Sequence, residues 1–491
     1  MHTGEKVFIA IDIGTTHAKA VTVSVNAVVL HSASVSYPVI ESAAGMSEQN
    51  PEVLLKSVVN LLQQSVAANM QNNIQCISFS AAMHSLLPVD AHGNPLLNAL
   101  TWADTRSSKQ AADILQQEDA AEIYRQTGTP IHAMSPLCKI SWIRESLPDV
   151  FARTHKFISI KEYIFFRLFG KYLVDYSIAS ATGLFNILTL QWNELSLEVA
   201  GITEVHLSAP VPVTHMETTL THEWQEAWAL QRIPFIIGAN DGCLANLGCG
   251  ALHPNELALT IGTSGAVRLV TQQPYAARLN TVFNYILTDH LYITGGPTNN
   301  GGNIVQWLTQ QLLFTNEEDK NAADTVALAA SVTAGAEGLL FLPYLYGERA
   351  PVWDANAKGA FIGLQHIHTR AHFARAVLEG ICYGLYDIFT SLHTLTQGVD
   401  IIYASGGFTQ SAFWLQMIAD IFGMEVAVTD SADASAMGAV FLGMHALGYL
   451  QEPQDAKSFT AIKEKYSPNP QTHQLYRLQY ETFRQLYTRL Q

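Results

Sequence analysis

An aspartate stands inside an apolar strand pattern near the start of the chain. The segment VFIAIDIGTTHAKAVTV, residues 7–23, alternates apolar residues around Asp12 and then turns through a glycine and two threonines. Aspartate is depleted in strands and costs free energy in a core unless a partner offsets its charge. We therefore expect a neighbouring side chain, a bound ion or a substrate to interact with Asp12.

A second aspartate stands where a predicted strand meets a predicted helix. In FIIGANDGCLANLGCG, residues 235–250, an apolar strand is followed by Asp241 and then by small residues suited to a closely packed helix. Such an aspartate can cap the helix, or it can accept a proton in a cleft between two lobes. Phosphoryl transfer needs little more from a protein than such a base, a metal and donors around the phosphates.

The turn after Asp12 has a counterpart in the second half of the chain. IAIDIGTTHAKAV, from Ile9, aligns with LALTIGTSGAVRL, from Leu257. Each segment alone predicts an ordinary β-turn, but two such hairpins can offer N–H groups and hydroxyls to two sides of a polyphosphate. Asp12 aligns with Thr260, so the hairpin itself does not require an aspartate. Neither a Walker loop nor a Rossmann fingerprint is present.

Two further stretches of small residues open predicted helices in the second half. In ASGGFTQSAFWLQMIADIFG, residues 404–423, Gly406 and Gly407 leave room for a flat ring against the backbone, and Ser411 follows one turn later. A purely structural glycine turn is the alternative. ADASAMGAVFLG, residues 432–443, predicts a second small-residue helix start that packs tightly on its neighbours.

Polar residues gather in two stretches of the first half, AAMHSLLPV and LTWADTRSS. Each stretch follows or interrupts an apolar run, so these side chains can project from strand ends into one cleft and contact a substrate. The candidates are Met83, His84, Trp102, Asp104 and Arg106. A structural histidine and an ordinary Asp104–Arg106 ion pair are the alternatives. Lys139 and Lys161 are further basic candidates for contacting a substrate. The alternative is that both are solvated charges on the surface.

Helical and strand patterns alternate along the chain. Residues 51–70, 371–395 and 473–491 predict amphipathic helices, and IQCISFS and IIYASGG predict the strands that follow the first two. This alternation indicates α/β lobes, and the length of 491 residues indicates two or three domains. We place the boundary near Cys243–Pro254, which gives domains 1–245 and 246–491.

Composition narrows the class of protein. Only 14% of residues are charged, and the formal net charge of −15 argues against nucleic acid or an anionic membrane as the main partner. The five cysteines lack C-x-x-C spacing and are expected to be buried packing residues in a reducing cytosol. We expect a cytoplasmic enzyme acting on a small molecule, without a membrane segment. The oligomeric state stays open, and a homodimer is one option.

Taken together, these stretches resemble the FGGY carbohydrate kinases, which belong to the sugar kinase, heat-shock ATPase and actin superfamily. The resemblance covers nearly the whole chain and rests on ordered matches: IDIGTTHAKA, MHS, TWADTRS, GANDGC, LTIGTSGA, GGPTNNGGNIVQWL, GERAPVWD and ASGGFTQSAFWLQMIADIFG. It implies two ribonuclease-H-like lobes with a central cleft that holds ATP and Mg²⁺. The sugar would lie in a deeper pocket, lined mostly by the first lobe.

The resemblance also assigns roles to single residues. It places Asp241 at the catalytic base, which also touches substrate and metal, and Asp12 at the metal, where Mg²⁺ through water would supply its missing partner. The nucleotide contacts that it implies are Thr15, Thr16, Gly262 and Thr263 at the phosphates, Gly302 and Gln306 beside them, and Gly406, Gly407 and Ser411 at the adenosine.

Within the family the first-lobe stretches are most similar to the gluconate kinases. Xylulose kinases typically show Gln-Met-His-Gly where this chain has Ala82-Met83-His84-Ser85. A sugar acid beside His84, Arg106 and Lys139 or Lys161 would gain charge-assisted hydrogen bonds. The resemblance therefore implies phosphorylation of D-gluconate to 6-phospho-D-gluconate. Kinases of xylulose, ribulose or glycerol, and a non-catalytic actin-like ATP switch, are the alternatives.

Overall fold

The computed structural model describes residues 4–69, 71–227, 233–275, 281–313, 321–392, 395, 397–429 and 433–490. The chain forms two compact units. Unit 1 comprises Met1–Gly250, Thr271–Ile293 and Asp433–Phe459, and unit 2 comprises Ala251–Val270, Thr294–Ala432 and Thr460–Gln491. Each unit contains strands and helices, so the predicted α/β class is confirmed.

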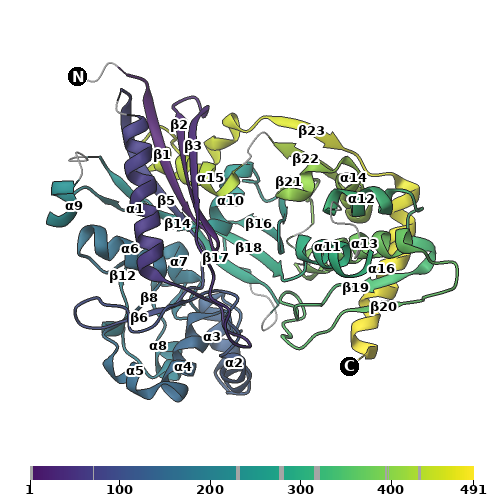
Figure 1. Ribbon diagram of the computed structural model, residues 1–491, viewed down its shortest axis with the longest axis horizontal. Helices are drawn as coiled ribbons and strands as arrows, with labels where there is room; N and C mark the ends of the chain where they lie inside the picture. Colours follow the sequence, from purple (N-terminus) through teal and green to yellow (C-terminus); the bar gives the residue numbers. More distant parts are fainter. Residues whose placement is uncertain are drawn as a thin grey trace. The chain divides into compact units, whose positions relative to one another are not determined.

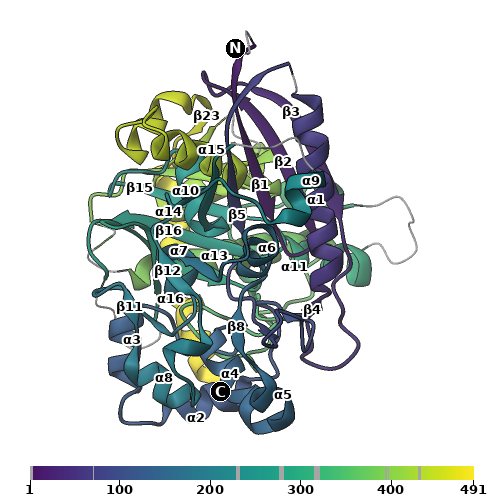
Figure 2. The ribbon, with the colours of Figure 1, turned by 90° about the vertical axis from the view of Figure 1, so that its left-hand side faces the viewer.

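Unit 1 is built on a six-stranded sheet with the order β13-β14-β5-β1-β2-β3. Its strands are β1 (Lys6–Ile13), β2 (His17–Ser24), β3 (Val29–Ser36), β5 (Asn73–Ala81), β13 (Met216–Glu217) and β14 (Phe235–Asn240). β1 pairs antiparallel with β2, while β1, β5 and β14 are parallel. Figure 2 shows β5, β1, β2 and β3 following one another across this sheet. The parallel strands therefore end at one edge of the sheet.

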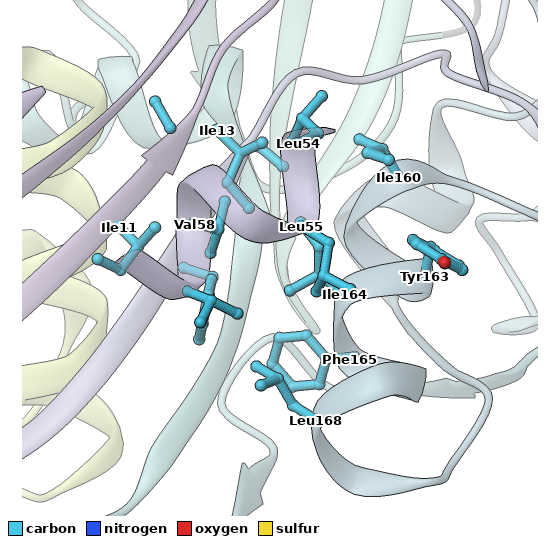
Figure 3. Close-up of a cluster of buried hydrophobic side chains, with 14 of the residues drawn as sticks. Ile11, Ile13, Leu54, Leu55, Val58, Ile160, Tyr163, Ile164, Phe165 and Leu168 are labelled. Carbon is cyan, nitrogen blue, oxygen red and sulfur yellow. The ribbon is translucent and has the colours of Figure 1, made fainter. Parts of the chain in front are cut away.

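Alternate residues of β1 face two different helical layers, as the period of two in a strand requires. Ile9, Ile11 and Ile13 pack with α1 (Pro51–Ala68) and α6 (Ile160–Phe169) in one buried apolar cluster. Figure 3 shows this cluster, in which Ile11 and Ile13 lie against Leu54 and Val58 of α1. The other face of the sheet is covered by α10 (Asp241–Cys249) and α15 (Ala434–Ala446) (Figure 1). Asp12 lies on this second face.

Helix α1 begins where the sequence provides both a cap and a proline. Asn50 accepts hydrogen bonds from the backbone N–H groups of Glu52 and Val53, at 3.0 and 3.2 Å, and Pro51 occupies the first helical position. These groups satisfy N–H donors that lack a partner at a helix start. The helix is thereby fixed at its first turn, with its apolar face on β1 and β2.

Helices α10 and α15 cross with their backbones in contact. A Cβ atom on Gly438 would lie 2.0 Å from the carbonyl oxygen of Leu244, and one on Gly248 would lie 1.8 Å from that of Ala434. Only glycine lets two helix backbones approach this closely. The tight packing that the small residues of 432–443 predict is therefore confirmed, and it fixes α15 against the helix that Asp241 begins.

The segment between β5 and β14 adds a mostly helical part to unit 1. It has an apolar core of its own, which includes Leu137, Ile140, Ile143 and Phe185. Besides α6, its α-helices are α2 (Ser108–Leu115), α3 (Ala120–Thr127), α4 (Pro136–Ser146), α5 (Pro148–Arg153), α7 (Tyr176–Ser180), α8 (Glu194–Ala200) and α9 (His222–Ala227). Short strands such as β6 (Leu87–Val89) and β8 (Lys156–Ile158) tie this part together.

Unit 2 repeats the strand pattern of unit 1. The second sheet, most of whose strands belong to unit 2, has the order β17-β18-β16-β15-β21-β22-β23. Here β15 (Glu256–Ile261) pairs antiparallel with β16 (Gly265–Thr271) and parallel with β21 (Ile401–Ser405), which is parallel to β22 (Glu425–Thr429). The other strands are β17 (Phe283–Thr288), β18 (Leu291–Thr298) and β23 (Ile462–Tyr466). The aligned hairpins thus occupy equivalent places in their sheets.

The predicted long helices of the second half are present. They are α13 (Arg370–Ser391), α14 (Ala412–Phe422) and α16 (Pro470–Leu490), beside α11 (Gly302–Leu308) and α12 (Ala322–Ala330). Residues 70, 393–394, 432 and 491 of the predicted elements lie outside the described residues. The five cysteines are free and buried, as predicted. Among the described helices, none combines the length and apolar character needed to span a membrane.

The glycine crossing generates a stability prediction. Gly438→Ala should lower the free energy of unfolding by about 1–3 kcal/mol, because the added methyl group meets backbone that cannot move aside. Gly384→Ala in α13 is the matched control, since its Cβ would meet only Pro343 Cγ at 3.7 Å. Alanine there should leave stability unchanged or raise it by up to about 1 kcal/mol. Thermal and urea unfolding measure both variants, and an unchanged midpoint for Gly438→Ala would contradict the crossing.

Candidate active site

Asp12 is held at the end of β1 by one hydrogen bond, from a residue far away in sequence. Ser435 Oγ of α15 donates to Asp12 Oδ2 at 2.7 Å. The other carboxylate oxygen, Oδ1, is buried and has no hydrogen-bond partner within the described residues. A buried carboxylate oxygen without a donor is costly. Asp12 therefore keeps one oxygen to which the described residues supply no donor.

Asp241 follows β14 and begins α10, but it is not the residue that caps this helix. Asn240 accepts a hydrogen bond from Cys243 N at 2.7 Å and is itself held by Ser177, whose Oγ lies 2.8 Å from Asn240 Nδ2. Asp241 is half-buried and its Oδ1 accepts from Gly242 N at 2.7 Å. The capping role that the sequence allowed for Asp241 thus belongs to its neighbour.

Gly238 sets the direction in which β14 ends. Its φ is +74°, and a Cβ atom there would lie 1.6 Å from the carbonyl oxygen of Phe79 in β5. The pairing of β14 with β5 shifts register between Ile236 and Ala239. A glycine at such a bulge re-aims the residues that follow it. Asp241 therefore leaves the sheet by way of a bulge that no other residue type fits.

Asp12 lies near the end of β1 and Asp241 directly follows β14, two strands of the same sheet. Asp12 is in register with Ser80 of β5, and Ala239 of β14 is in register with the same Ser80. The strands that carry them are thus separated by one strand, which corresponds to about 10 Å between their backbones. Asp12 and Asp241 therefore converge on one edge of one sheet, which is suitable for one bound group.

The hairpin turn after Asp12 is tied to the predicted substrate stretch. Trp102 Nε1 donates to Thr15 Oγ1 at 3.0 Å, and Gln49 Nε2 donates to the Thr15 carbonyl at 2.7 Å. Thr16 is exposed, and its hydroxyl lies 3.2 Å from His17 Nδ1. The structure therefore brings Trp102 beside the turn of Thr15 and Thr16, within unit 1.

Asp104 anchors Arg106 and does not reach the surface. Its side chain is fully buried, accepts from Ser47 N at 3.0 Å, and pairs with Arg106 Nη2 at 2.7 Å. Arg106 Nη2 also contacts Glu48 Oε1 at 2.6 Å, and its guanidinium lies over the Trp142 ring. The ion-pair reading of Asp104 and Arg106 is thus the one that the geometry supports. Arg106 keeps 22% of its side chain exposed.

His84 is buried and both of its ring nitrogens face protein groups. Nδ1 lies 2.7 Å from the Ala181 carbonyl, which can only accept, so Nδ1 carries a proton. Nε2 lies 3.1 Å from the hydroxyl of Tyr285, which can then donate to it. The backbone of His84 has a φ of +66°, and Met83 packs against the neighbouring core. This geometry gives His84 a structural place, and its contact with a substrate stays a prediction.

Lys139 and Lys161 are buried and satisfied, contrary to the alternative of solvated surface charge. Lys139 Nζ donates to the carbonyl of His84 at 2.6 Å and to that of Thr101 at 2.7 Å. Lys161 Nζ pairs with Asp175 Oδ2 at 2.8 Å. Burial lowers the pKa of Lys139 to about 7 and also lowers that of Lys161. Lys139 thereby joins the two stretches that carry the substrate candidates.

His84 and Ser85 are among the residues that line a small pocket. Most of its lining is apolar, including Leu86, Ile140 and Phe157, with Glu162 as its acidic member. Ser85 Oγ accepts from Ile160 N at 3.1 Å, so the hydroxyl at this position caps a helix start. An apolar lining of this kind does not suit a molecule with many hydroxyl groups.

In unit 2, the turn after β15 contacts the start of α11. Gly302 N donates to the Gly262 carbonyl at 2.8 Å, and Asn303 N donates to that of Thr263 at 3.2 Å. Gly262 and Thr263 are exposed, as is Gln306 on α11. The structure therefore brings the predicted phosphate residues of this unit together with Gly302 and Gln306.

The predicted adenosine residues follow β21, the strand that pairs with β15. Thr260 of β15 is in register with Ser405 of β21, so Gly262 and Gly407 both follow neighbouring strand ends. A Cβ atom on Gly262 or Gly407 would meet no protein atom within 4 Å, which leaves open space beside both backbones. Gly406 is different, because its Cβ would lie 2.3 Å from the carbonyl oxygen of Ile261.

Ser411 is a helix cap, and the helix begins later than the sequence predicts. A short 3₁₀ turn covers Gly407–Gln410, and α14 begins at Ala412. Ser411 Oγ accepts from Trp414 N at 3.2 Å. Its hydroxyl oxygen is thus engaged in the fold, and the contact of Ser411 with adenosine stays a prediction.

The residues around Asp12 fit a Mg²⁺ ion that is held mainly by other ligands. Within the described residues, no group of three or more His, Cys, Asp or Glu side chains is arranged to hold a metal. Mg²⁺ usually keeps several waters and takes one or two carboxylates together with substrate phosphates. The unpartnered Asp12 Oδ1 suits such a site, either directly or through water.

The sequence alone does not predict several residues of this site. Ser435, Glu48, Gln49 and Tyr285 contact the predicted residues from distant parts of the chain. Only Ser435 stood in a stretch that the sequence marked, and there its neighbours indicated packing alone. Long-range contacts of this kind leave no local pattern.

Comparisons with known proteins assign both halves of the chain to one family. The N-terminal domain of the FGGY family of carbohydrate kinases matches residues 7–248, and the C-terminal domain matches residues 257–447. The chain belongs to the FGGY family of carbohydrate kinases. It is therefore an ATP-dependent phosphotransferase of the sugar kinase class.

The relatives of this FGGY kinase include enzymes named for two different substrates, gluconate and xylulose. It is 41% identical to the gluconokinase of Bacillus subtilis over 466 residues, 93% of this chain and 89% of that protein. It is 32% identical to the xylulose kinase of Staphylococcus epidermidis over 493 residues, 98% of this chain and 97% of that protein. The crystal structure of gluconate kinase from Lactobacillus acidophilus superposes with a TM-score of 0.94 at 34% identity, covering 99% of this chain and 98% of that one.

The buried Lys139 predicts that the stability of this FGGY kinase depends on pH. Because its pKa is about 7 in the fold and about 10.4 in an unfolded chain, the unfolded state binds more protons between these values. Stability should therefore rise with pH from about 7 to about 10. Lys139→Met should lack this pH dependence. Its free energy of unfolding should also be about 1–3 kcal/mol lower, because two buried carbonyls are left without a donor.

Urea unfolding of the wild type and of Lys139→Met across this pH range measures the effect, because other titrating groups are common to both proteins. The stability difference between them should widen as the pH rises. Parallel pH profiles would contradict the buried, weakly protonated amine.

Proposed function

We propose that this kinase transfers the γ-phosphoryl group of ATP to the terminal hydroxyl of D-gluconate, forming 6-phospho-D-gluconate and ADP. The observation that carries the proposal is the convergence of Asp12 and Asp241 on one sheet edge, on strands separated only by β5. Gluconokinase relatives at 41% and 40% identity, against 32% for the xylulose kinases, support gluconate as the acceptor.

Asp241 is proposed as the general base. Its carboxylate would take the proton as the O–H bond of the acceptor breaks, a new O–P bond forms, and the bond from the γ-phosphorus to the leaving oxygen of ADP breaks. Asn240 already caps α10, so Asp241 has no capping duty that would compete with this role. A positioned base contributes roughly 10²–10⁴ in rate.

Asp12 is proposed to hold Mg²⁺, directly or through water. When bound, Mg²⁺ neutralises part of the charge on the triphosphate. The residues proposed to contact phosphates are Thr15 and Thr16 in unit 1 and Gly262, Thr263, Gly302 and Gln306 in unit 2. The open backbone at Gly407, beside Gly406, is proposed to face the adenosine. Unit 2 would thus carry most of the nucleotide contacts.

The acceptor is proposed to lie beside Trp102 and Arg106 in unit 1. Lys139 and Lys161 are already engaged by protein groups, which leaves Arg106 as the donor for the carboxylate of the sugar acid. Within the described residues its Nη1 makes no hydrogen bond, while Nε and Nη2 are held by Asp104 and Glu48. The two carboxylates fix the plane of the guanidinium, so its remaining edge is pre-oriented for a charge-assisted hydrogen bond.

Replacing the proposed base gives a direct test of mechanism. Asp241→Asn should lower turnover by roughly 10²–10⁴ because the amide cannot accept the proton, while the affinity for ATP changes little. Steady-state release of ADP and calorimetric binding of ATP measure the two effects. Near-normal turnover in Asp241→Asn would remove this residue from the role of base.

A panel of acceptors tests the substrate. ADP release should be fastest with D-gluconate, and much slower with xylulose, ribulose and glycerol, because these neutral acceptors leave the Arg106 edge without a carboxylate. A preference for a neutral ketose or polyol would contradict gluconate and identify the alternative. Absence of ADP release with every acceptor would favour a non-catalytic ATP switch.

A further inference from the structure

Ser435 determines which oxygen of Asp12 is available. Its hydroxyl has one proton to donate, and it donates that proton to Oδ2. The carboxylate of Asp12 is then fixed in one orientation, with Oδ1 buried and without a partner in the described part of the chain. Without the serine, no hydrogen bond from the described residues would distinguish the two oxygens of this carboxylate.

The unpartnered oxygen of Asp12 does not stand alone. Ser80 of β5 is in register with Asp12, and parallel strands place such residues side by side on one face. Ser80 Oγ is likewise buried and has no hydrogen-bond partner among the described residues. Two neighbouring oxygens that lack partners indicate that a polar group, water or a hydrated ion, completes the site at this point.

The position of Ser435 is itself fixed from two sides. Lys19, which lies opposite Asp12 in the β1–β2 hairpin, forms an ion pair with Asp433, the residue that precedes α15. One turn further on, Gly438 brings α15 into backbone contact with α10. The serine hydroxyl is therefore presented to Asp12 by a helix that cannot shift freely.

We propose that Ser435 is a positioning residue for the metal: it turns the Asp12 carboxylate so that Oδ1 faces the hydrated Mg²⁺ ion, with Ser80 Oγ beside it. This inference rests on the proposed function, which places Mg²⁺ at Asp12. Outer residues that orient a metal-binding side chain typically affect metal affinity by 10-fold or more. Ser435→Ala should therefore weaken metal binding in the complex with nucleotide about tenfold.

The test measures binding as well as activity. Mn²⁺ replaces Mg²⁺ as a spectroscopic probe, and electron paramagnetic resonance counts free Mn²⁺ in the presence of a non-hydrolysable ATP analogue. Ser435→Ala should show the tenfold weaker binding, Ser435→Thr should restore it by keeping the hydroxyl, and the KM for gluconate at saturating metal should not change. Ser458→Ala is the matched control, because that exposed hydroxyl only donates to the Asp455 carbonyl.

Asp12→Asn separates the two ways in which the account can fail. If Mn²⁺ binding weakens in Asp12→Asn but is the same in Ser435→Ala as in the wild type, the role of Ser435 is overturned and the metal site stands. If Mn²⁺ binding survives unchanged in Asp12→Asn, the proposed metal site itself is overturned. If Ser435→Thr binds as weakly as Ser435→Ala, the hydroxyl is not the group that matters, which also overturns the role.

Discussion

The crossing of α10 and α15 is the constraint on which the site in unit 1 depends. Backbone contact at Gly248 and Gly438 fixes the two helices against each other, and the start of each helix carries a residue of the site. One start carries Asp241, and the other carries Ser435, which reaches Asp12 across the sheet edge. The two acids therefore owe their placement to packing between helices as much as to the strands that precede them. Small residues at this crossing therefore support the site through packing.

The two units use one strand plan for different chemistry. In unit 2, Thr260 stands where Asp12 stands in unit 1, and its hydroxyl lies 2.8 Å from that of Ser405 and accepts from Arg268 Nη1 at 3.2 Å. A neutral group with partners in the fold needs no ion. The aspartate thus marks the unit that we propose to hold the metal, while the open backbone of Gly262 and Gly407 marks the unit that we propose to hold the nucleotide.

The sequence predicted the elements and the acids, but not the contacts that orient them. Apolar alternation around Asp12 and the helical spacing after Pro51 are local signals, and both elements formed as expected. The sequence left Asp241 open between base and cap; the structure assigns the cap to Asn240, and the role of base stays a proposal. Lys139 looked like a surface or ligand charge because nothing nearby in sequence shows the carbonyls that it binds. Such long-range partners become visible only when the chain is folded.

The central claim is that Asp12 and Asp241 serve one phosphoryl transfer, the first at the metal and the second at the acceptor hydroxyl. A crystal structure with Mg²⁺, a non-hydrolysable ATP analogue and D-gluconate tests it most directly. The account predicts a carboxylate oxygen of Asp241 within about 2.6–3.2 Å of the terminal hydroxyl of gluconate, and Mg²⁺ or one of its waters at Asp12 Oδ1. A terminal hydroxyl turned away from Asp241, or a metal bound without Asp12, would contradict it.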